Sequence, residues 1–229
     1  MLIIAIPKSA SSSLVSTLCS HHSLDNAAEA LRRKYARHLP VPDAYKHMAK
    51  IHYEFRELNR AWAEEAAAAG VISKFHIPPT QNNCDLLRDI KKVILLRAPE
   101  NIIDAYHRGD ATGVFPVRSP DFCFSFSKQG WHARAQKHGV LDELHNFEQG
   151  WRAHDGDKLV IDYDALVNEP QATLNRVESY FGLPETSIAE LSRQRYTRQS
   201  AAPLSKTKRF QNHLRRIFKH AKKTITRKI

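Results

Sequence analysis

The chain has 229 residues, 42% of them hydrophobic, and a formal net charge of +11, which is enough for one hydrophobic core and predicts a single domain. Its three cysteines, Cys19, Cys84 and Cys123, are too few and too scattered for a disulfide framework or a zinc site, and they suit a reducing compartment. No apolar run is long enough to span a membrane, and the opening run lacks the basic start and cleavage site of a signal peptide, so we expect a cytoplasmic protein.

Four short apolar runs are predicted to form β-strands. They span residues 2–6, 71–75, 92–96 and 158–161. Their apolarity is continuous rather than alternating, which is typical of strands that are buried on both faces of a parallel sheet. We therefore predict an α/β fold with a central parallel sheet of about four to five strands flanked by helices.

Helical patterns follow these strands. The expected helices span residues 11–21, a long window at 43–69, residues 99–107 and residues 170–181. The last two begin with a proline, which fits the first turn of a helix. Residues 108–126 are rich in Gly, Pro, Ser and Phe, and we expect a long loop there that serves a site.

The stretch PKSASSSL follows the first strand, at the edge where parallel sheets bind ligands. It offers a lysine, the N–H groups of a helix start and several hydroxyls, all of which bind phosphate-like anions. The residues concerned are Lys8, Ser9, Ser11, Ser12 and Ser13. The stretch is not a Walker A loop, because the required glycines are absent. Taken alone, it is equally consistent with a serine-capped turn beside a solvent-exposed lysine.

Other polar residues follow the remaining strands. Lys74 and His76 lie two residues apart and so share one face of a strand end; an imidazole is the usual general base for a hydroxyl. Because the chain has thirteen histidines, an ordinary half-exposed strand end is an alternative interpretation. Arg97 follows the third strand, where a guanidinium binds a phosphate or pairs with a carboxylate. Tyr163 lies just past the fourth strand, at the same edge.

In this order, the stretches resemble the PAPS-dependent sulfotransferase family, where PAPS is 3′-phosphoadenosine-5′-phosphosulfate. The resemblance rests on PKSASSSL, KFHIP, VILLRAPENIIDAY and LVIDYDALVNEPQATLNRVESYFGLP, and it spans residues 1–185. It implies a P-loop-NTPase-like sulfotransferase architecture. It also implies transfer of a sulfuryl group from PAPS to an acceptor hydroxyl, with 3′,5′-bisphosphoadenosine as the product and without a metal.

The resemblance implies roles for single residues. The loop of Lys8, Ser9, Ala10, Ser11, Ser12 and Ser13 would hold the 5′-phosphosulfate, with Lys8 also meeting charge on the bridging oxygen. His76 matches the catalytic base of the family, and Lys74 matches the lysine beside it. Arg97 would bind the 3′-phosphate, and Tyr163 would lie near the adenine.

Several positions depart from the family pattern. Ala10 replaces a glycine, so the loop is expected to lack a position with positive φ. Ser13 replaces an aromatic residue, and Ala105 stands where a serine for the 3′-phosphate is expected. Asp104 is an unfavourable carboxylate there unless it faces away. The late basic segment for the 3′-phosphate is not recognisable, and its possible substitutes are Arg193, Arg195, Arg198 and Lys206.

These departures leave other functions open. One alternative is a degenerate, non-catalytic protein of the same fold, and another is a membrane or nucleic-acid binder that uses the basic tail. A kinase of similar architecture is disfavoured by the absent Walker A loop. The charged set of Lys8, Lys74, His76 and Arg97 favours the enzyme.

The acceptor is expected to bind between the 43–69 window and residues 108–130. Aromatic residues within reach, which either stack on a sugar or phenol ring or simply pack in the core, are Phe115, Phe122, Phe124, Phe126 and Trp131. A glycan, a glycolipid and a small-molecule hydroxyl acceptor all fit. We favour a glycan or glycolipid, partly because of the tail.

The positive charge is concentrated in residues 206–229, which contain ten Lys or Arg and no Asp or Glu. Residues 1–205, the predicted sulfotransferase-like domain, are close to neutral, so we expect no nucleic-acid partner. Apolar residues recur at helical spacing in the tail, which predicts a basic amphipathic helix. Such a helix either binds an anionic membrane surface, placing the protein at its inner face, or docks on the domain with its basic side in solvent.

Overall fold

The computed structural model describes residues 1–35, 38–112 and 127–188, together with residues 191, 205, 207, 208 and 211. A single parallel sheet of five strands lies at its centre, in the order β2-β3-β1-β4-β5. The strands are β1 (Leu2–Ala5), β2 (Asp25–Asn26), β3 (Val71–Phe75), β4 (Lys92–Leu96) and β5 (Lys158–Asp162). The predicted α/β class and parallel sheet are confirmed, with β2 as the additional, fifth strand.

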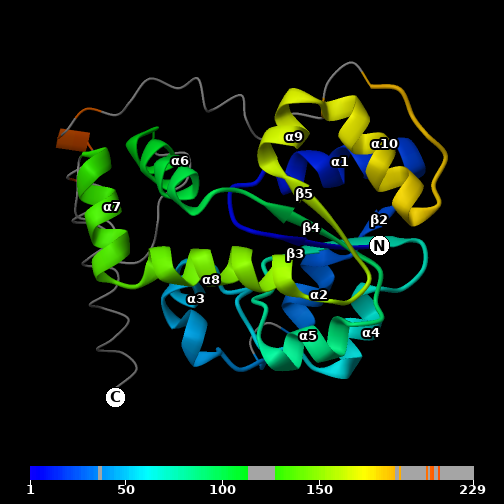
Figure 1. Ribbon diagram of the computed structural model, residues 1–229, viewed down its shortest axis with the longest axis horizontal. Coiled ribbons are helices and arrows are strands. Elements are labelled where there is room, and N and C mark those ends of the chain that lie inside the picture. The colour runs from blue at the N-terminus through cyan, green and yellow to red at the C-terminus, as the bar shows by residue number, and fades with distance from the viewer. Residues whose placement is uncertain are drawn as a thin grey trace.

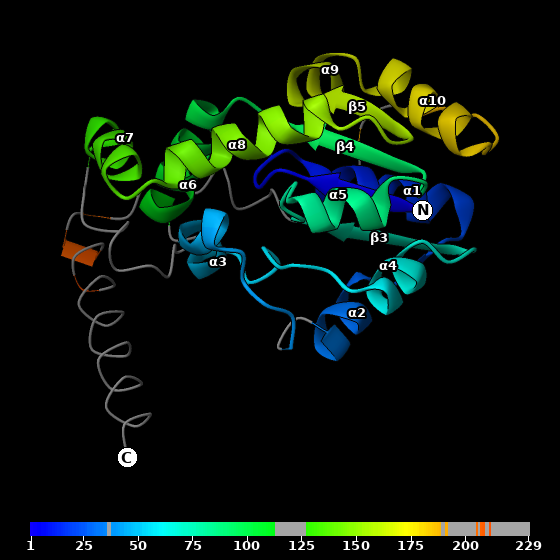
Figure 2. The same cartoon turned by 60° about the horizontal axis from the view of Figure 1, so that its bottom comes forward.

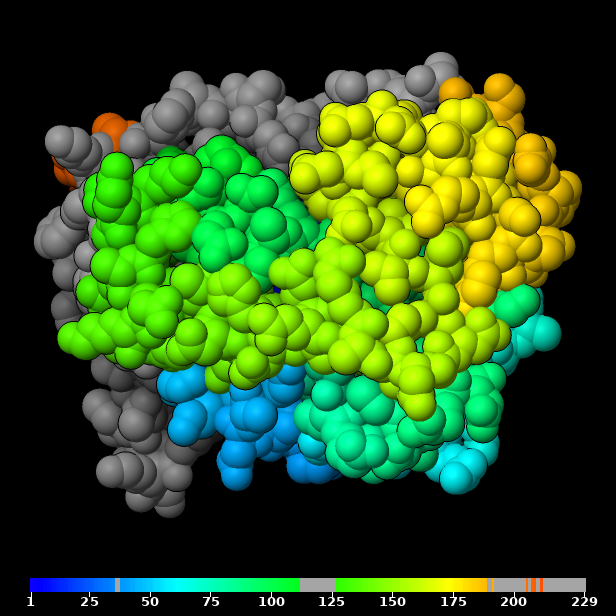
Figure 3. Space-filling view, viewed as in Figure 1, coloured from blue at the N-terminus to red at the C-terminus, as the bar shows by residue number. Residues whose placement is uncertain are grey.

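Helices cover both faces of this sheet (Figures 1 and 2). On one face lie α1 (Ser11–His22), α9 (Tyr163–Asn168) and α10 (Pro170–Phe181). On the other lie α2 (Ala28–Tyr35), the 3₁₀ turn η1 (Asp43–Tyr45), α3 (Lys46–Ile51), α4 (Arg60–Ala66), α5 (Gln81–Leu87), α6 (Pro99–Thr112), α7 (Lys128–Lys137) and α8 (Val140–Ala153). Figure 3 shows α6 to α10 joined in one surface over the side of the molecule that faces the viewer.

The central strand β1 is buried on both faces, which explains its unbroken apolar sequence. Leu2 and Ile4 contribute to the core beneath α2 to α8, whereas Ile3 and Ala5 contribute to the core beneath α1, α9 and α10. This two-sided burial is the pattern expected of a parallel strand.

The topology has a switch point at the carboxyl end of β1. After β1 the chain turns to the face that carries α1, whereas after β3 and β4 it turns to the opposite face. Ligands of open α/β sheets bind where neighbouring connections diverge in this way. The residues just past β1, β3 and β4 therefore line the expected ligand position.

The prediction of one long helix over residues 43–69 is wrong. The structure has the short helices α3 and α4 there, separated by a non-helical segment, residues 52–59. Side-chain partners from elsewhere replace helical hydrogen bonds in this segment: Asn83 Oδ1 accepts from the Leu58 N–H at 2.7 Å, and Asn83 Nδ2 donates to the Arg56 carbonyl at 2.9 Å. Asn59 then caps the start of α4 by accepting from the Trp62 N–H. Tertiary contacts thus override local helix propensity.

Other expectations change less. Helix α6 continues past residue 107 to Thr112, so the beginning of the loop expected at 108–126 is helical, and residues 113–126 lie outside the described residues. The expected tail helix and the boundary at residue 205 also lie outside them, apart from a few positions. Within the described part of the chain, no helix has the length and apolar composition needed to cross a bilayer.

Candidate active site

The loop after β1 has a left-handed backbone at two non-glycine residues. Lys8 has φ 65° and Ala10 has φ 60°. The expectation that Ala10 would prevent a positive φ is therefore wrong, because the alanine adopts the glycine-like conformation at a steric cost of about 1–2 kcal/mol. Ala10 is also the N-cap of α1, and its side chain gives no capping hydrogen bond. Left-handed residues next to a helix start turn successive N–H groups toward a common anion.

The serines of this loop have different surroundings. The Ser9 hydroxyl is buried and donates to the Ile6 carbonyl at 2.7 Å, which closes the turn after β1. Ser11 and Ser13 are buried at the start of α1, whereas Ser12 is exposed. The loop is thus held from inside by a side-chain hydrogen bond, which leaves its main chain and the exposed side chain of Ser12 to meet a ligand.

Arg97, at the end of β4, fixes this loop from the neighbouring strand. Its Nη1 donates to the Lys8 carbonyl oxygen at 2.6 Å, and its guanidinium carbon lies 3.9 Å from the centroid of the Tyr163 ring. Tyr163 begins α9 directly after β5. The structure therefore brings together three of the predicted residues from three strands, and the tyrosine stacks on the arginine.

The Lys8 ammonium sits in a crowded cationic environment. Its Nζ lies 5.5 Å from the centroid of the Tyr106 ring of α6. Burial, and after it the charges of Arg97 and Lys74, lowers the pKa of Lys8 to about 7. A bound anion would relieve this repulsion, because opposite charge favours the ammonium form.

His76 has a defined tautomer. Its Nδ1 lies 2.6 Å from the Ala5 carbonyl oxygen, and because a carbonyl only accepts, Nδ1 carries the proton. The lone pair is therefore on Nε2, to which Lys74 Nζ donates at 3.5 Å, at the long limit for a hydrogen bond. Burial, followed by the charge of Lys74, lowers the pKa of His76 well below its ordinary value. The ring is thus a neutral proton acceptor at physiological pH.

The sequence analysis did not single out His52, which lies next to His76, or Tyr106, which contacts His52. The His52 ring meets the His76 ring edge-on, with centroids 4.9 Å apart, and His52 Nε2 lies 2.6 Å from the Tyr106 hydroxyl. Burial raises the pKa of Tyr106 well above its ordinary value, so the phenol stays protonated. These contacts link the surroundings of Lys8 to those of His76.

The third residue missed is Glu54, in the non-helical segment 52–59. Its carboxylate accepts from Arg32 Nε at 2.6 Å and from the His76 main-chain N–H at 2.9 Å. Burial opposes its ionisation, but Lys74, Arg32 and His52 together hold the pKa of Glu54 below the ordinary value. No local sequence pattern marks this glutamate, since its role depends on a segment that was predicted to be helical.

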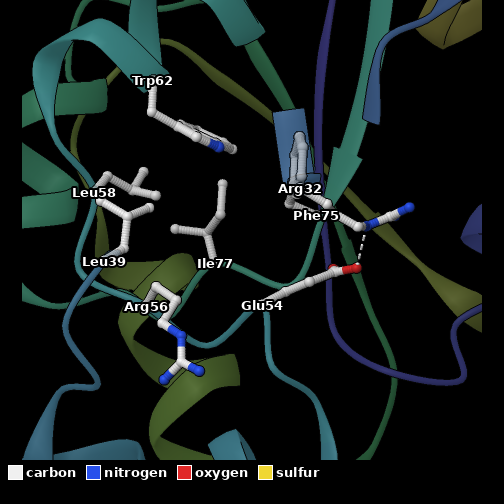
Figure 4. Close-up of a pocket in the computed structure, with 8 residues that line it drawn as sticks. All are labelled: Arg32, Leu39, Glu54, Arg56, Leu58, Trp62, Phe75 and Ile77. Atoms are coloured by element: carbon white, nitrogen blue, oxygen red, sulfur yellow. Dashed lines mark hydrogen bonds and ion pairs between the residues drawn. The ribbon is translucent and has the colours of Figure 1, made fainter. Parts of the chain in front are cut away.

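A partly open pocket lies beside Glu54, on the side of α2 and α4 (Figure 4). It is small: the space open to the centre of a water-sized sphere is about 20 Å³, enough for little more than one water molecule. Leu39, Leu58, Trp62 and Ile77 form its apolar part, and the Arg32–Glu54 ion pair lies across from them. The pocket therefore combines an apolar wall with guanidinium groups, one of them from Arg56.

The remaining predicted positions have other surroundings. Asp104 faces α7, where it pairs with Lys128 and His132 at 2.8 Å each. Trp131 is fully buried in the core. The aromatic residues at 115, 122, 124 and 126, and the basic residues Arg193, Arg195, Arg198 and Lys206, lie outside the described residues.

The donor set fits a nucleotide with several negative charges. The helix start at residues 8–13, the ammonium of Lys8 and the guanidinium of Arg97 are all phosphate-binding groups, and they meet at one sheet edge. Among the described residues, no group of histidine, cysteine, aspartate and glutamate side chains is arranged to hold a metal ion.

No protein-family model matches the sequence, and no curated protein is significantly similar to it. Among solved structures, the chain is similar to a sulfotransferase from Alicyclobacillus acidocaldarius, with 12% identity and a TM-score of 0.47. The alignment covers 94% of this chain and 92% of that one. At this level of similarity, membership of the PAPS-dependent family stays a prediction.

Proposed function

We propose that the protein is a sulfotransferase that moves the sulfuryl group of PAPS to an acceptor hydroxyl. The observation that carries the proposal is the position of His76, whose proton is held on Nδ1, at the same sheet edge as the anion-binding loop of Lys8 and Ala10. An anion site beside a neutral base is the combination that group transfer to a hydroxyl requires.

The donor would be held by residues of three strand ends. The main chain at the start of α1 and the Lys8 ammonium suit the 5′-phosphosulfate, and Arg97 suits the 3′-phosphate. When bound, PAPS supplies an activated sulfuryl group and a bisphosphate leaving group. Transfer of this kind depends mainly on positioning and on neutralising the leaving oxygen, which is the role of Lys8. Lys74 would add a second positive charge beside His76.

His76 would act as the general base. Its Nε2 lone pair would take the proton of an acceptor hydroxyl in place of the long contact with Lys74 Nζ at 3.5 Å, and the Ala5 carbonyl keeps the ring in the required tautomer. In this role a histidine needs no metal and no further nucleophile.

The acceptor would contact the surface around the pocket beside Glu54, whose cavity is itself too small to hold a sugar. Its apolar and aromatic wall suits an acceptor with a hydrophobic surface, such as a sugar face or a glycolipid, and its guanidinium groups suit an acceptor that also carries negative charge. We retain the glycan or glycolipid as the proposed class, with contact between residues 206–229 and an anionic membrane surface as part of the same proposal.

The test is a transfer assay with ³⁵S-labelled PAPS and a panel of oligosaccharides, glycolipids and small hydroxyl compounds. We expect label in at least one product with the natural protein and none with His76→Ala, which should still bind 3′,5′-bisphosphoadenosine. Binding without transfer to any acceptor would favour the non-catalytic alternative. Equal transfer by His76→Ala would show that His76 is not the base.

A further inference from the structure

Glu54 occupies the position that a charge partner of His76 would need. Its Oε2 accepts from the His76 main-chain N–H at 2.9 Å and lies 4.0 Å from His76 Nε2. Both side chains are only 9% exposed, so little water reaches them to screen their charges from each other. The carboxylate therefore touches the main chain of His76 and approaches the ring nitrogen that carries the lone pair.

The opposite oxygen fixes the direction of this carboxylate. Glu54 Oε1 accepts from Arg32 Nε at 2.6 Å, as the dashed line in Figure 4 shows, and Arg32 also donates to the Lys74 carbonyl at 3.3 Å. Helix α2, the segment 52–59 and strand β3 are thus joined at one point. A carboxylate with both oxygens bonded has little rotational freedom, so its approach to Nε2 is part of the folded structure.

The charges around His76 create the need for such a partner. Lys74, Arg32 and Lys8 all oppose a positive charge on the His76 ring, and the adjacent His52 ring does not compensate it. If His76 takes a proton, its imidazolium forms among these cations. The Glu54 carboxylate is the negative group within 4.0 Å of the ring nitrogen that would bear the new proton.

We propose that Glu54 is the positioning residue of the proton acceptor, holding the His76 main chain and forming an ion pair with the imidazolium that appears during transfer. In this step the acceptor O–H bond breaks, its proton goes to His76 Nε2, and the acceptor oxygen forms the new bond to sulfur. The electron pair of the broken S–O bond leaves with the phosphate oxygen. The inference rests on the proposed function, because it assigns a partner to the same base.

The matched variants are Glu54→Gln and Glu54→Asp. Glutamine keeps the shape and an accepting oxygen but removes the charge, whereas the shorter aspartate keeps the charge but places it farther from His76. Glu57→Gln is the control, since Glu57 belongs to the same segment and bonds to Thr80 and Asn82 instead. We expect Glu54→Gln to lower kcat by roughly ten- to a hundredfold, with KM for PAPS within about twofold of the natural value. Glu54→Asp should fall in between, and Glu57→Gln should match the natural protein.

A second readout needs no turnover. The His76 ring can be followed by ¹⁵N-imidazole NMR in the ligand-free protein as the pH is lowered. Because Glu54→Gln removes the negative charge 4.0 Å from His76 Nε2 and leaves Lys74, Arg32 and Lys8 to oppose the imidazolium, His76 should take up its proton at a lower pH than in the natural protein. The acid limb of the kcat profile should move in the same direction. A merely structural role of Glu54 would lower stability without moving either.

The outcomes distinguish a failure of the Glu54 inference from a failure of the proposed function. If Glu54→Gln retains kcat within about twofold, or His76 titrates at an unchanged pH, Glu54 is not the partner of the base. If Glu54→Gln does not fold, natural kcat in Glu54→Asp overturns the inference equally. If the natural protein neither binds 3′,5′-bisphosphoadenosine nor transfers sulfate, the proposed function fails, while the His76 titration still decides whether the two residues are coupled.

Discussion

The Arg97 side chain at the end of β4 donates to the Lys8 carbonyl oxygen of the loop after β1, at 2.6 Å and across 89 residues of sequence. The same guanidinium stacks on Tyr163, which follows β5. Three strand ends are therefore connected through one arginine before any ligand binds. Such preorganisation lowers the entropic cost of binding, because the groups need not be ordered by the ligand.

The stacking contact gives the first prediction. Tyr163→Leu should weaken the binding of 3′,5′-bisphosphoadenosine by about two- to fivefold, because a cation–π contact of this kind contributes roughly 0.5–1 kcal/mol and orients Arg97. Tyr163→Phe keeps the ring and should stay within about twofold. Isothermal titration calorimetry measures the affinity of the two variants. Equal losses of affinity in both would show that the aromatic ring does not support binding.

The second prediction concerns pH. Because the pKa of Lys8 in the free protein is about 7, an anion that binds next to it above this pH must bring a proton onto the lysine. The affinity for 3′,5′-bisphosphoadenosine should therefore fall as the pH rises from 7 to 9, by up to about tenfold per pH unit. The second pKa of the phosphates is about 6, so they are already about nine-tenths ionised at pH 7, and their own titration would raise the affinity slightly with pH, opposite to the predicted fall.

Calorimetry in two buffers of different ionisation enthalpy measures the proton uptake directly. Lys8→Met should bind weakly and without this pH dependence. Lys137→Met, an exposed lysine of α7, is the matched control and should behave like the natural protein. A flat affinity between pH 7 and 9 in the natural protein would contradict the assigned state of Lys8.

The third prediction concerns the strained loop. Ala10→Gly should raise the free energy of unfolding by about 0.5–1 kcal/mol, because glycine adopts the observed φ of 60° without the steric cost, which exceeds the added entropy of the unfolded chain. Ser23→Gly, at the left-handed C-cap of α1, is the control with a similar backbone. Thermal unfolding compares them, and a loss of stability in Ala10→Gly would argue against the loop conformation.

The fourth prediction concerns the segment that carries Glu54. Asn83→Ala should lower the free energy of unfolding by about 2–4 kcal/mol, because it removes the partners of the Leu58 N–H and of the Arg56 and Pro78 carbonyls. Asn82, whose side chain is more exposed, is the neighbouring control, and Asn82→Ala should cost less than about 1 kcal/mol. Urea unfolding measures both, and similar values would mean that Asn83 does not fix the segment.

The sheet was predictable because strands that are buried on both faces, such as Lys92–Leu96, have almost continuously apolar sequences. The positions of Lys8, His76 and Arg97 followed from it, since parallel strands place their carboxyl ends at one edge. The segment 52–59 was not predictable from local pattern. Its backbone is held by Asn83, and Glu54 meets His76 22 residues away, contacts that only the folded chain creates.

The left-handed Ala10 illustrates the same limit. Residue type argues against positive φ at an alanine, yet the loop adopts it, with Arg97 bonded to the Lys8 carbonyl and Ser9 to that of Ile6. Contacts from a neighbouring strand can offset about 1–2 kcal/mol of strain, and sequence alone does not reveal them.

The most direct test of the proposed donor site is its selectivity for the 3′-phosphate. Calorimetry should compare 3′,5′-bisphosphoadenosine with AMP, on the natural protein and on Arg97→Lys. We expect the natural protein to bind the bisphosphate at least about tenfold more tightly, and Arg97→Lys to lose most of this preference, because a bidentate guanidinium contact cannot be replaced by an ammonium. Equal affinities of the natural protein for the two nucleotides would contradict a PAPS site.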